Sequence, residues 1–347
     1  MAGFSDQISS TIENVKSARL PPKLTENTLV RLDQLGKLTD SPSFLSEFEK
    51  FNHFIDWAIN LPWEKRTPDI LDLTHAKEIL DKNHYGLSEI KDRILEYIAV
   101  LKLKGEDRSE VVRAPILCFV GLVGTGKTTI AYSIAEALGR KFARIPFGGM
   151  GDPLDLRGQS RMHPEAEPGK VIKALRATTS RNPVILFDEI DRVTDEGRAS
   201  IMGVLVELLD PEQNHAFIDH YIDYPFDLSE VLFIATANNT INISTAVLDR
   251  LEPISMPSYT DSEKITIGRS YVLPRTLREA GIPEGVLSFE DSVWPKIVRP
   301  LGFDAGIRTL ERTIEGVVRK VARLLVEGKI KQLTISESNI KEYLPQW

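Results

Sequence analysis

The stretch GLVGTGKTT, residues 121–129, has the residue types and spacing that bind a phosphate chain. Glycines let the backbone fold around an anion so that its N–H groups point inward. We expect Lys127 to reach the β- and γ-phosphates of a nucleotide, and the Thr128 hydroxyl to bind Mg²⁺. The residues of this glycine loop that are predicted to bind nucleotide are Gly121, Gly124, Thr125, Gly126, Lys127, Thr128 and Thr129.

Two neighbouring carboxylates follow in PVILFDEID, residues 183–191. An apolar strand would deliver Asp188 and Glu189 at its carboxyl end, where ligands bind in open α/β sheets. We expect Asp188 to hold Mg²⁺ through water and Glu189 to polarise an attacking water molecule. The second role turns a nucleotide binder into a hydrolase, so the pair predicts an ATPase.

A further apolar run, FIATANN at residues 233–239, ends in two amides. Either Asn238 or Asn239 could hydrogen-bond the same water or the γ-phosphate. Asparagine pairs are also common in turns. The residues alone leave the two interpretations open.

These side chains need a scaffold that brings them together. Four short apolar runs, PILCFV, KFARIPF, PVILFD and VLFIATAN, alternate with helical patterns between residues 76 and 257. Continuous apolar strands separated by helices predict a parallel sheet with helices on both faces. The expected fold class is therefore α/β, with the polar residues at the carboxyl edge of the sheet.

Helical segments flank this predicted nucleotide-binding domain. Residues 1–75 read as helices, and apolar side chains at helical spacing in SPSFLSEFEKFNHFIDWAINLPW are expected to pack on neighbouring helices. Residues 258–347 read as a small, mostly α-helical third domain. It opens with a capping box formed by Thr260 and Glu263.

Composition excludes several classes of protein. The net charge of −7 argues against nucleic acid as a partner, since phosphate binders concentrate Lys and Arg. A single cysteine, Cys118, fits a reducing compartment and is expected to be a buried thiol. The sequence shows no secretory signal and no apolar run near the roughly 18 residues that span a bilayer. We expect a cytoplasmic protein without a membrane partner.

The motifs together resemble the ATPase module of the Lon protease family, within the AAA+ superfamily. The resemblance covers roughly residues 40–345. It rests on LPWEKRTPDILDL, HYGLSEIKDRILEYIAV, the glycine loop, GRKFARIPFGG, RNPVILFDEID, LLDPEQNHAFIDHY, FIATANN, VLDRLEPI and AGIRTLER. It implies a P-loop AAA+ sheet preceded by a helical segment and followed by a helical lid.

The resemblance also assigns further roles. His84 and Tyr85 match the adenine-side segment, and Asn238 matches the first sensor. Arg250 matches the arginine finger that reaches the γ-phosphate of a neighbouring subunit, and Arg308 matches the second sensor of the same chain. Surface salt bridges are the alternative for both arginines. A finger used between subunits implies a homo-oligomer, and the family implies a six-membered ring.

The sequence departs from the family in three respects, one of which is RASI at Arg198–Ile201, where the family has RGDP in a segment that could also face the pore. No segment resembles the Ser–Lys peptidase domain or the large N-terminal domain, so we expect no proteolytic site in this chain. In the segment RGQSRMHPEAEPGK, residues 157–170, the family carries a tyrosine and an aliphatic residue that grip polypeptide in the pore of the ring. Here His163 and Pro164 stand at those positions, with Glu165 and Glu167 close behind.

Three functions follow as hypotheses. The first is an ATP-hydrolysing motor or remodelling module that acts on a protein, with a separate peptidase as a possible partner. The second is a nucleotide-controlled regulatory or assembly module that threads no polypeptide. The third is the ATPase fragment of an ATP-dependent Lon-type serine protease.

Overall fold

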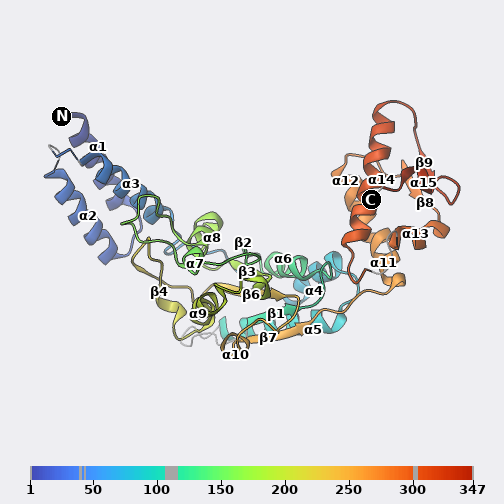
Figure 1. Cartoon of the computed structure of the whole chain (residues 1–347), viewed down its shortest axis with the longest axis horizontal. Helices are drawn as coiled ribbons and strands as arrows, with labels where there is room; N and C mark the ends of the chain where they lie inside the picture. The colour runs from blue at the N-terminus through green and yellow to red at the C-terminus, as the bar shows by residue number, and fades with distance from the viewer. Residues whose placement is uncertain (1, 39–40, 43, 106–115, 300–303, 346–347) are drawn as a thin grey trace.

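The computed structural model describes residues 2–38, 41–42, 44–105, 116–299 and 304–345. Figure 1 shows an elongated chain in which helices α1–α3 form one end, a parallel sheet lies in the middle, and a small helical unit with the C-terminus forms the other end. The site expected from the sequence lies in the middle part, where the sheet meets the small unit.

The sheet is parallel throughout and has the order β2-β3-β6-β1-β7. Its strands are β1 (Ile116–Val120), β2 (Phe142–Pro146), β3 (Val184–Asp188), β6 (Leu232–Ala237) and β7 (Leu251–Ser255). Because β3, β6 and β1 are adjacent, their carboxyl ends form one continuous edge. The parallel α/β sheet predicted from the apolar runs is confirmed.

Both faces of the sheet are buried, as the uninterrupted apolar strands require. Successive side chains alternate between two cores: Leu117 and Leu186 pack on one face, whereas Cys118 and Ile185 pack on the other. The first face carries α4 (Leu73–Asn83), α5 (Ser88–Gly105) and α6 (Lys127–Ala137), and the second carries α8 (Lys170–Thr178) and α9 (Arg198–Leu209). Burial raises the pKa of the Cys118 thiol to about 12, which makes it a packing residue.

The N-terminal helices are α1 (Ala2–Ser17), α2 (Pro22–Gly36) and α3 (Phe44–Asn60). Phe48 and Phe54 of α3 are each 3% exposed and belong to the same core as the second face of the sheet. The expected packing of this aromatic stripe against neighbouring parts of the chain is therefore confirmed. Residue 75, where the helical segment was expected to end, lies inside α4.

The small C-terminal unit has its own core around Trp294 and the long helix α14 (Arg308–Val326). The predicted capping box of Thr260 and Glu263 is present at the start of its first helix. Its elements are α11 (Asp261–Ile267), the π-helical turn η3 (Gly268–Val272), α12 (Leu273–Glu279), α13 (Trp294–Val298), α14 (Arg308–Val326), α15 (Ile340–Tyr343), and the parallel pair β8 (Leu287–Phe289) and β9 (Leu333–Ile335).

Short elements connect the larger ones in both the sheet domain and the small C-terminal unit. They are α7 (Leu154–Arg157), α10 (Thr245–Leu248), the antiparallel pair β4 (Phe217–Ile218) and β5 (Pro225–Phe226), and the 3-10 turns Ile190–Arg192, Asn214–Ala216 and Asp291–Val293. Within the described ranges, no helix combines the length and the apolar character needed to cross a membrane.

Candidate active site

The glycine loop joins the end of β1 to the start of α6. Gly124 and Gly126 have φ values of +82° and +94°, in the left-handed region where a side chain is unfavourable. Gly126 is the N-cap of α6, and no side chain caps the helix there. The first N–H groups of α6 are therefore open to an anion, whose charge the helix dipole also favours.

Lys127 is turned inward, with 7% of its surface exposed. Its ammonium donates to the carbonyl oxygens of Gly121 at 2.6 Å and Leu122 at 3.0 Å, and to Oδ1 of Asn238 at 3.2 Å. Burial lowers the pKa of Lys127, and the nearby charge of Asp188 acts in the opposite direction. The direct hydrogen-bond partners of this ammonium are all neutral oxygens, so it lacks an anion in direct contact. A phosphate would supply that anion.

The other polar residues of the loop keep its shape. The Thr125 hydroxyl donates to the Leu122 carbonyl at 2.9 Å, and the Thr129 hydroxyl donates to the Gly126 carbonyl at 2.8 Å. Both hydroxyls are hydrogen-bonded within the loop, so a nucleotide would bind the backbone N–H groups at these positions.

Asp188 ends β3 and faces Thr128 across the edge of the sheet. The Thr128 hydroxyl lies 3.4 Å from Asp188 Oδ1, and the Thr236 hydroxyl donates to the same oxygen. Arg144 donates to Oδ2 through Nε at 2.7 Å and Nη2 at 2.5 Å. The structure thus brings together the two residues predicted to bind magnesium.

The residues fit a magnesium ion that arrives with a nucleotide. Thr128 and Asp188 offer hard oxygen ligands, which Mg²⁺ prefers. No group of three or more His, Cys, Asp or Glu side chains that could hold a metal occurs among the described residues. Mg²⁺ ordinarily binds through one or two protein oxygens together with substrate phosphates, and this site offers that arrangement.

Glu189 has a strained backbone. Its φ and ψ are 58° and 51°, and its N–H donates to Thr236 Oγ1 at 2.9 Å. A non-glycine residue held in this region costs about 1–3 kcal/mol, and such residues cluster at functional sites. The Glu189 carboxylate lies 3.6 Å from Arg192 and is partly exposed, so it faces the open side of the edge.

The two asparagines after β6 have different surroundings. Asn238 accepts from Lys127, and its amide nitrogen is buried without a hydrogen-bond partner among the described residues. The Asn239 oxygen accepts the N–H of Ile241 at 3.0 Å, which is a turn contact. Of the two asparagines, Asn238 is therefore the one that contacts Lys127.

Arg250 is not part of this cluster. Its guanidinium donates to the Ala246 carbonyl at 2.7 Å and to Asp210 at 2.8 Å. The hydrogen bond from Arg250 is the main reason why the pKa of Asp210 is lowered. Within the described chain, Arg250 makes no contact with Lys127, Asp188 or Glu189.

Arg308 lies beside the glycine loop through its backbone. It is the first residue of α14, and the preceding Ile307 N–H donates to the Gly124 carbonyl at 3.0 Å. A Cβ on Gly306 would lie 2.5 Å from the Gly124 carbonyl carbon, so the two backbones are in close contact. The Arg308 side chain is exposed and pairs with no residue that the structure describes.

His84 is a buried tether rather than an open side chain. Its Nε2 lies 2.9 Å from Ser133 Oγ of α6, which in turn accepts from Asn83 Nδ2 at 3.0 Å. His84, Ser133 and Asn83 thus form one hydrogen-bonded group that links the α4 segment to α6. Burial lowers the pKa of His84 to about 4, and a hydrogen bond with the backbone of Thr129 acts in the opposite direction.

Tyr85, the second residue of the predicted adenine-side pair, contacts the small C-terminal unit. Its ring centroid lies 6.4 Å from that of Tyr271, in an edge-to-face arrangement. Tyr271 also donates to the Asp81 carbonyl at 3.4 Å. The segment that carries His84 and Tyr85 thus lies between α6 and the small unit.

The ends of the 157–170 segment are fixed by a buried carboxylate. Asp219 is 1% exposed and accepts N–H groups from Gly169 at 2.7 Å, Tyr221 at 2.8 Å and Ile222 at 3.1 Å. A Cβ on Gly158 would lie 2.8 Å from the same carboxylate. Burial raises the pKa of Asp219, and the three N–H groups oppose that shift.

The tip of this segment is open. The Arg161 guanidinium lies 4.1 Å from the centre of the Phe54 ring of α3. This contact holds the part of the segment that precedes the tip. Met162 is 91% exposed, and His163 and Pro164 are exposed next to it. The most prominent apolar side chain at the tip is therefore a methionine one residue before the expected position.

Sequence reasoning missed four residues. Arg144 and Thr236 contact Asp188, Asp219 fixes the 157–170 segment, and Met162 projects from it. Thr236 lies in the quoted run FIATANN, and Asp219 lies in the quoted run that ends in DHY. The sequence could have pointed to these two residues. Thr236 is a polar residue inside an apolar run, and Asp219 lies in a segment that the family resemblance already singled out.

Two parts of the chain match known protein families. Residues 117–258 match the ATPase family associated with various cellular activities (AAA), and residues 278–334 match the Lon protease AAA+ ATPase lid domain.

Curated relatives are Lon proteases. That of Dictyoglomus thermophilum is 42% identical over 339 residues, which is 97% of this chain and 42% of the relative. That of Lawsonia intracellularis is 45% identical over 334 residues, 96% of this chain and 40% of the relative. Lon protease 2 of Thermus thermophilus is 44% identical over 333 residues, 94% of this chain and 41% of the relative. The chain thus spans about two fifths of the length of these relatives, and it contains the AAA+ ATPase module of the Lon protease family, an AAA domain followed by a Lon-type lid.

Proposed function

We propose that this module binds Mg²⁺-ATP at the edge formed by β1, β3 and β6, hydrolyses it, and uses the cycle to remodel a protein substrate. The observation that carries the proposal is the meeting of Lys127 with Asn238 and of Thr128 with Asp188 at that edge. These four residues come from three separate stretches of sequence, and the sheet order makes them neighbours.

The chain's residues divide the work of hydrolysis as follows. The N–H groups of the glycine loop and Lys127 bind the phosphates, and Asn238 orients a water molecule or the γ-phosphate. Glu189 takes a proton from the attacking water. Thr128 and Asp188 hold Mg²⁺, which when bound neutralises charge on the β- and γ-phosphate oxygens.

The two arginines are proposed to act from different directions. Arg308 stands next to the glycine loop on the lid and would report nucleotide within the same chain. Arg250 is separate from its own site, which a role at the site of a neighbouring subunit requires. Its ion pair with Asp210 is the salt bridge that stood as the alternative, and the finger role needs that pair to open. We therefore propose a homo-oligomer, in the form of a six-membered ring.

The units of this module are proposed to be a helical segment at 1–75, a nucleotide-binding domain at 76–257 and a lid at 258–347. His84 and Tyr85 are proposed to border the base of the nucleotide, between α6 and the lid. A cytoplasmic location is proposed from the single cysteine.

The variant Glu189→Gln tests the hypothesis that this module hydrolyses ATP with Glu189 as the general base. We expect the rate of phosphate release from Mg²⁺-ATP to fall about 100-fold or more, because general-base catalysis contributes at least that factor. Nucleotide binding, measured as the rise in the unfolding temperature on adding ATP, should persist. Glu196→Gln, an exposed residue seven positions away, is the matched control. Equal phosphate release by wild type and Glu189→Gln would refute the assignment.

A second function is favoured by the tip of the 157–170 segment. His163 and Pro164 offer little apolar surface, and Glu165 would repel acidic polypeptides, whereas Glu167 forms an ion pair with Lys173. On this reading, hydrolysis times an assembly and no polypeptide is threaded. The relatives are Lon proteases, which supports a third function, in which the module drives a peptidase within a longer ATP-dependent protease.

A further inference from the structure

The carboxylate of Asp188 is fully occupied by side chains of this chain. Oδ1 faces the hydroxyls of Thr128 and Thr236, and Oδ2 receives both Nε and Nη2 of Arg144. The Asp188 side chain is 5% exposed. A buried carboxylate with this little water needs a cationic partner, and here the partner in direct contact is Arg144.

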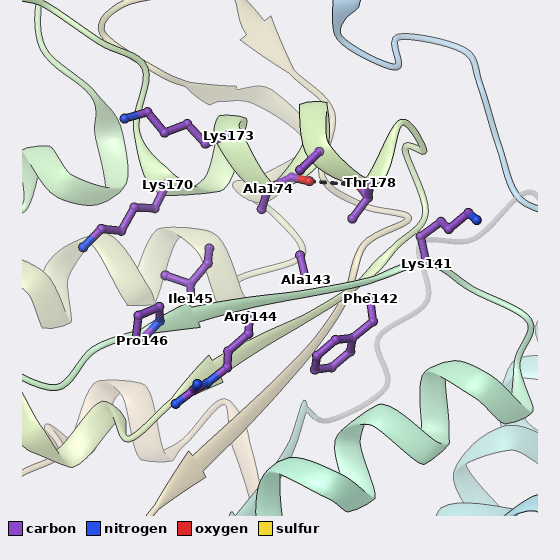
Figure 2. A pocket seen from close by; sticks show the side chains of 11 residues that line it. Lys141, Phe142, Ala143, Arg144, Ile145, Pro146, Lys170, Lys173, Ala174 and Thr178 are labelled. Atoms are coloured by element: carbon purple, nitrogen blue, oxygen red, sulfur yellow. Dashed lines mark hydrogen bonds between the residues drawn. The ribbon is translucent and has the colours of Figure 1, made fainter. Parts of the chain in front are cut away.

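Arg144 reaches the carboxylate from the edge of the sheet. It lies on β2, paired with Leu186 of β3, and Figure 2 shows it on the opposite side of β2 from Lys170 and Lys173. Its side chain is 53% exposed. Among the described residues it forms no ion pair other than that with Asp188, so no second contact keeps the guanidinium in place.

The arrangement puts two cations in competition. The proposed function places Mg²⁺ against Thr128 and Asp188, at the carboxylate that Arg144 now holds. Two positive groups at one carboxylate repel each other, and the partly exposed guanidinium can turn into water at lower cost than the buried carboxylate can move.

We propose that Arg144 is a displaceable counter-ion of Asp188, which orients the carboxylate before nucleotide binds and releases it to the incoming Mg²⁺. This inference rests on the proposed function. It makes Arg144 a positioning residue whose presence raises the Mg²⁺ concentration that the site requires. A permanent structural ion pair would have the opposite effect, because its loss would disorder Asp188 and weaken metal binding.

Mg²⁺ titrations of Arg144 variants separate the two roles. Unfolding temperature is measured with a saturating non-hydrolysable ATP analogue while Mg²⁺ is raised, and the half-saturating Mg²⁺ concentration is compared between variants. Arg144→Gln removes the charge, and Arg144→Lys keeps the charge without the two-pronged contact. Arg66→Gln is the matched control, since Arg66 is 46% exposed and forms an ion pair of 2.8 Å with Glu230 at the far side of the domain.

We expect the half-saturating Mg²⁺ concentration to fall about tenfold in Arg144→Gln. This takes the effect on Mg²⁺ affinity to be as large as the lower end of the effect on proton affinity, where an adjacent arginine lowers the pKa of a carboxylate by about one to three units. Arg144→Lys should lie between wild type and Arg144→Gln, and it decides the matter should the glutamine variant fail to fold. Without nucleotide and metal, Arg144→Gln should unfold at a lower temperature than wild type. Arg66→Gln should leave the half-saturating concentration unchanged.

The possible failures are distinguishable. An unchanged or higher Mg²⁺ requirement in both Arg144 variants, with wild type showing a normal titration, overturns the displaceable counter-ion and leaves the ATPase assignment standing. If wild type shows no stabilisation by the analogue at any Mg²⁺ concentration, the proposed function itself fails, and this inference fails with it.

Discussion

Acid should weaken the joint between α4 and α6 through His84. The imidazole is 7% exposed, and its Nε2 is hydrogen-bonded to Ser133 Oγ at 2.9 Å. Burial lowers its pKa from 6.5 to about 4, so the folded protein resists protonation where the unfolded chain accepts it. The depressed pKa therefore makes His84 a source of stability near neutral pH that acid removes.

The sign and size follow from the two pKa values. Between pH 6.5 and pH 4 the unfolded chain binds more protons at this site than the folded protein, so the free energy of unfolding falls as the pH falls. Each pKa unit corresponds to about 1.4 kcal/mol. The contribution is complete above pH 6.5, is reduced by about 2 kcal/mol at pH 5, and is reduced by about 3 kcal/mol below pH 4.

Urea unfolding of wild type and His84→Gln at pH 8 and pH 5 measures this effect. Other groups also titrate in this range, so the informative quantity is the difference in pH dependence between the two proteins. We expect wild type to lose about 2 kcal/mol more than His84→Gln between the two pH values. His215→Gln, an exposed histidine, should retain the pH dependence of wild type. The same pH dependence in wild type and His84→Gln would refute the buried neutral imidazole.

Two further predictions concern the lid and the 157–170 segment. Gly306→Ala places a Cβ 2.5 Å from the Gly124 carbonyl carbon, so we expect the lid to shift and ATP affinity to fall about tenfold or more, measured by nucleotide titration. Gly203→Ala, where no atom lies within 4 Å of the new Cβ, is its control, and equal affinities would contradict the close contact. Met162→Ala should lower the stimulation of ATP hydrolysis by an unfolded polypeptide several-fold and His163→Ala should lower it less, with the basal rate unchanged in both. We also expect the module to unfold a tagged substrate protein only slowly. Robust ATP-dependent unfolding of that substrate by the His163→Ala variant would show that the pore segment binds polypeptide well without His163, and would contradict this expectation.

The glycine loop was predictable because its signal is local. A strand, a turn that only glycine permits, and a helix follow one another within a short stretch, so residue types and spacing suffice. Asp188 was predictable for the same reason, as a carboxylate directly after a buried strand. The choice between Asn238 and Asn239 was not, since both follow β6 and only the register of the strand decides which side chain faces Lys127.

Arg144 could not be placed from sequence for a different reason. Its contact depends on β2 lying beside β3, with Pro146 opposite Asp188, and strand order is a property of the whole sheet. In the sequence it is one polar residue in the run KFARIPF, where an outward-facing arginine on an edge strand is ordinary. Met162 is similar, because exposure at a loop tip depends on how the ends of the segment are fixed, here by Asp219.

The contacts around the glycine loop explain how phosphate binding there could change the position of the lid and of the α4 segment. The Gly124 carbonyl accepts the N–H of Ile307, which connects the loop to the lid, while α6, which starts at Lys127, is held to the α4 segment through Ser133 and His84. The loop is thus hydrogen-bonded to the lid on one side and, through α6, to the α4 segment on the other. A nucleotide that draws Lys127 away from its carbonyl partners changes the loop to which both connections are joined. Hydrolysis would release that change, so the same few backbone contacts that shape the site can transmit its state to the lid.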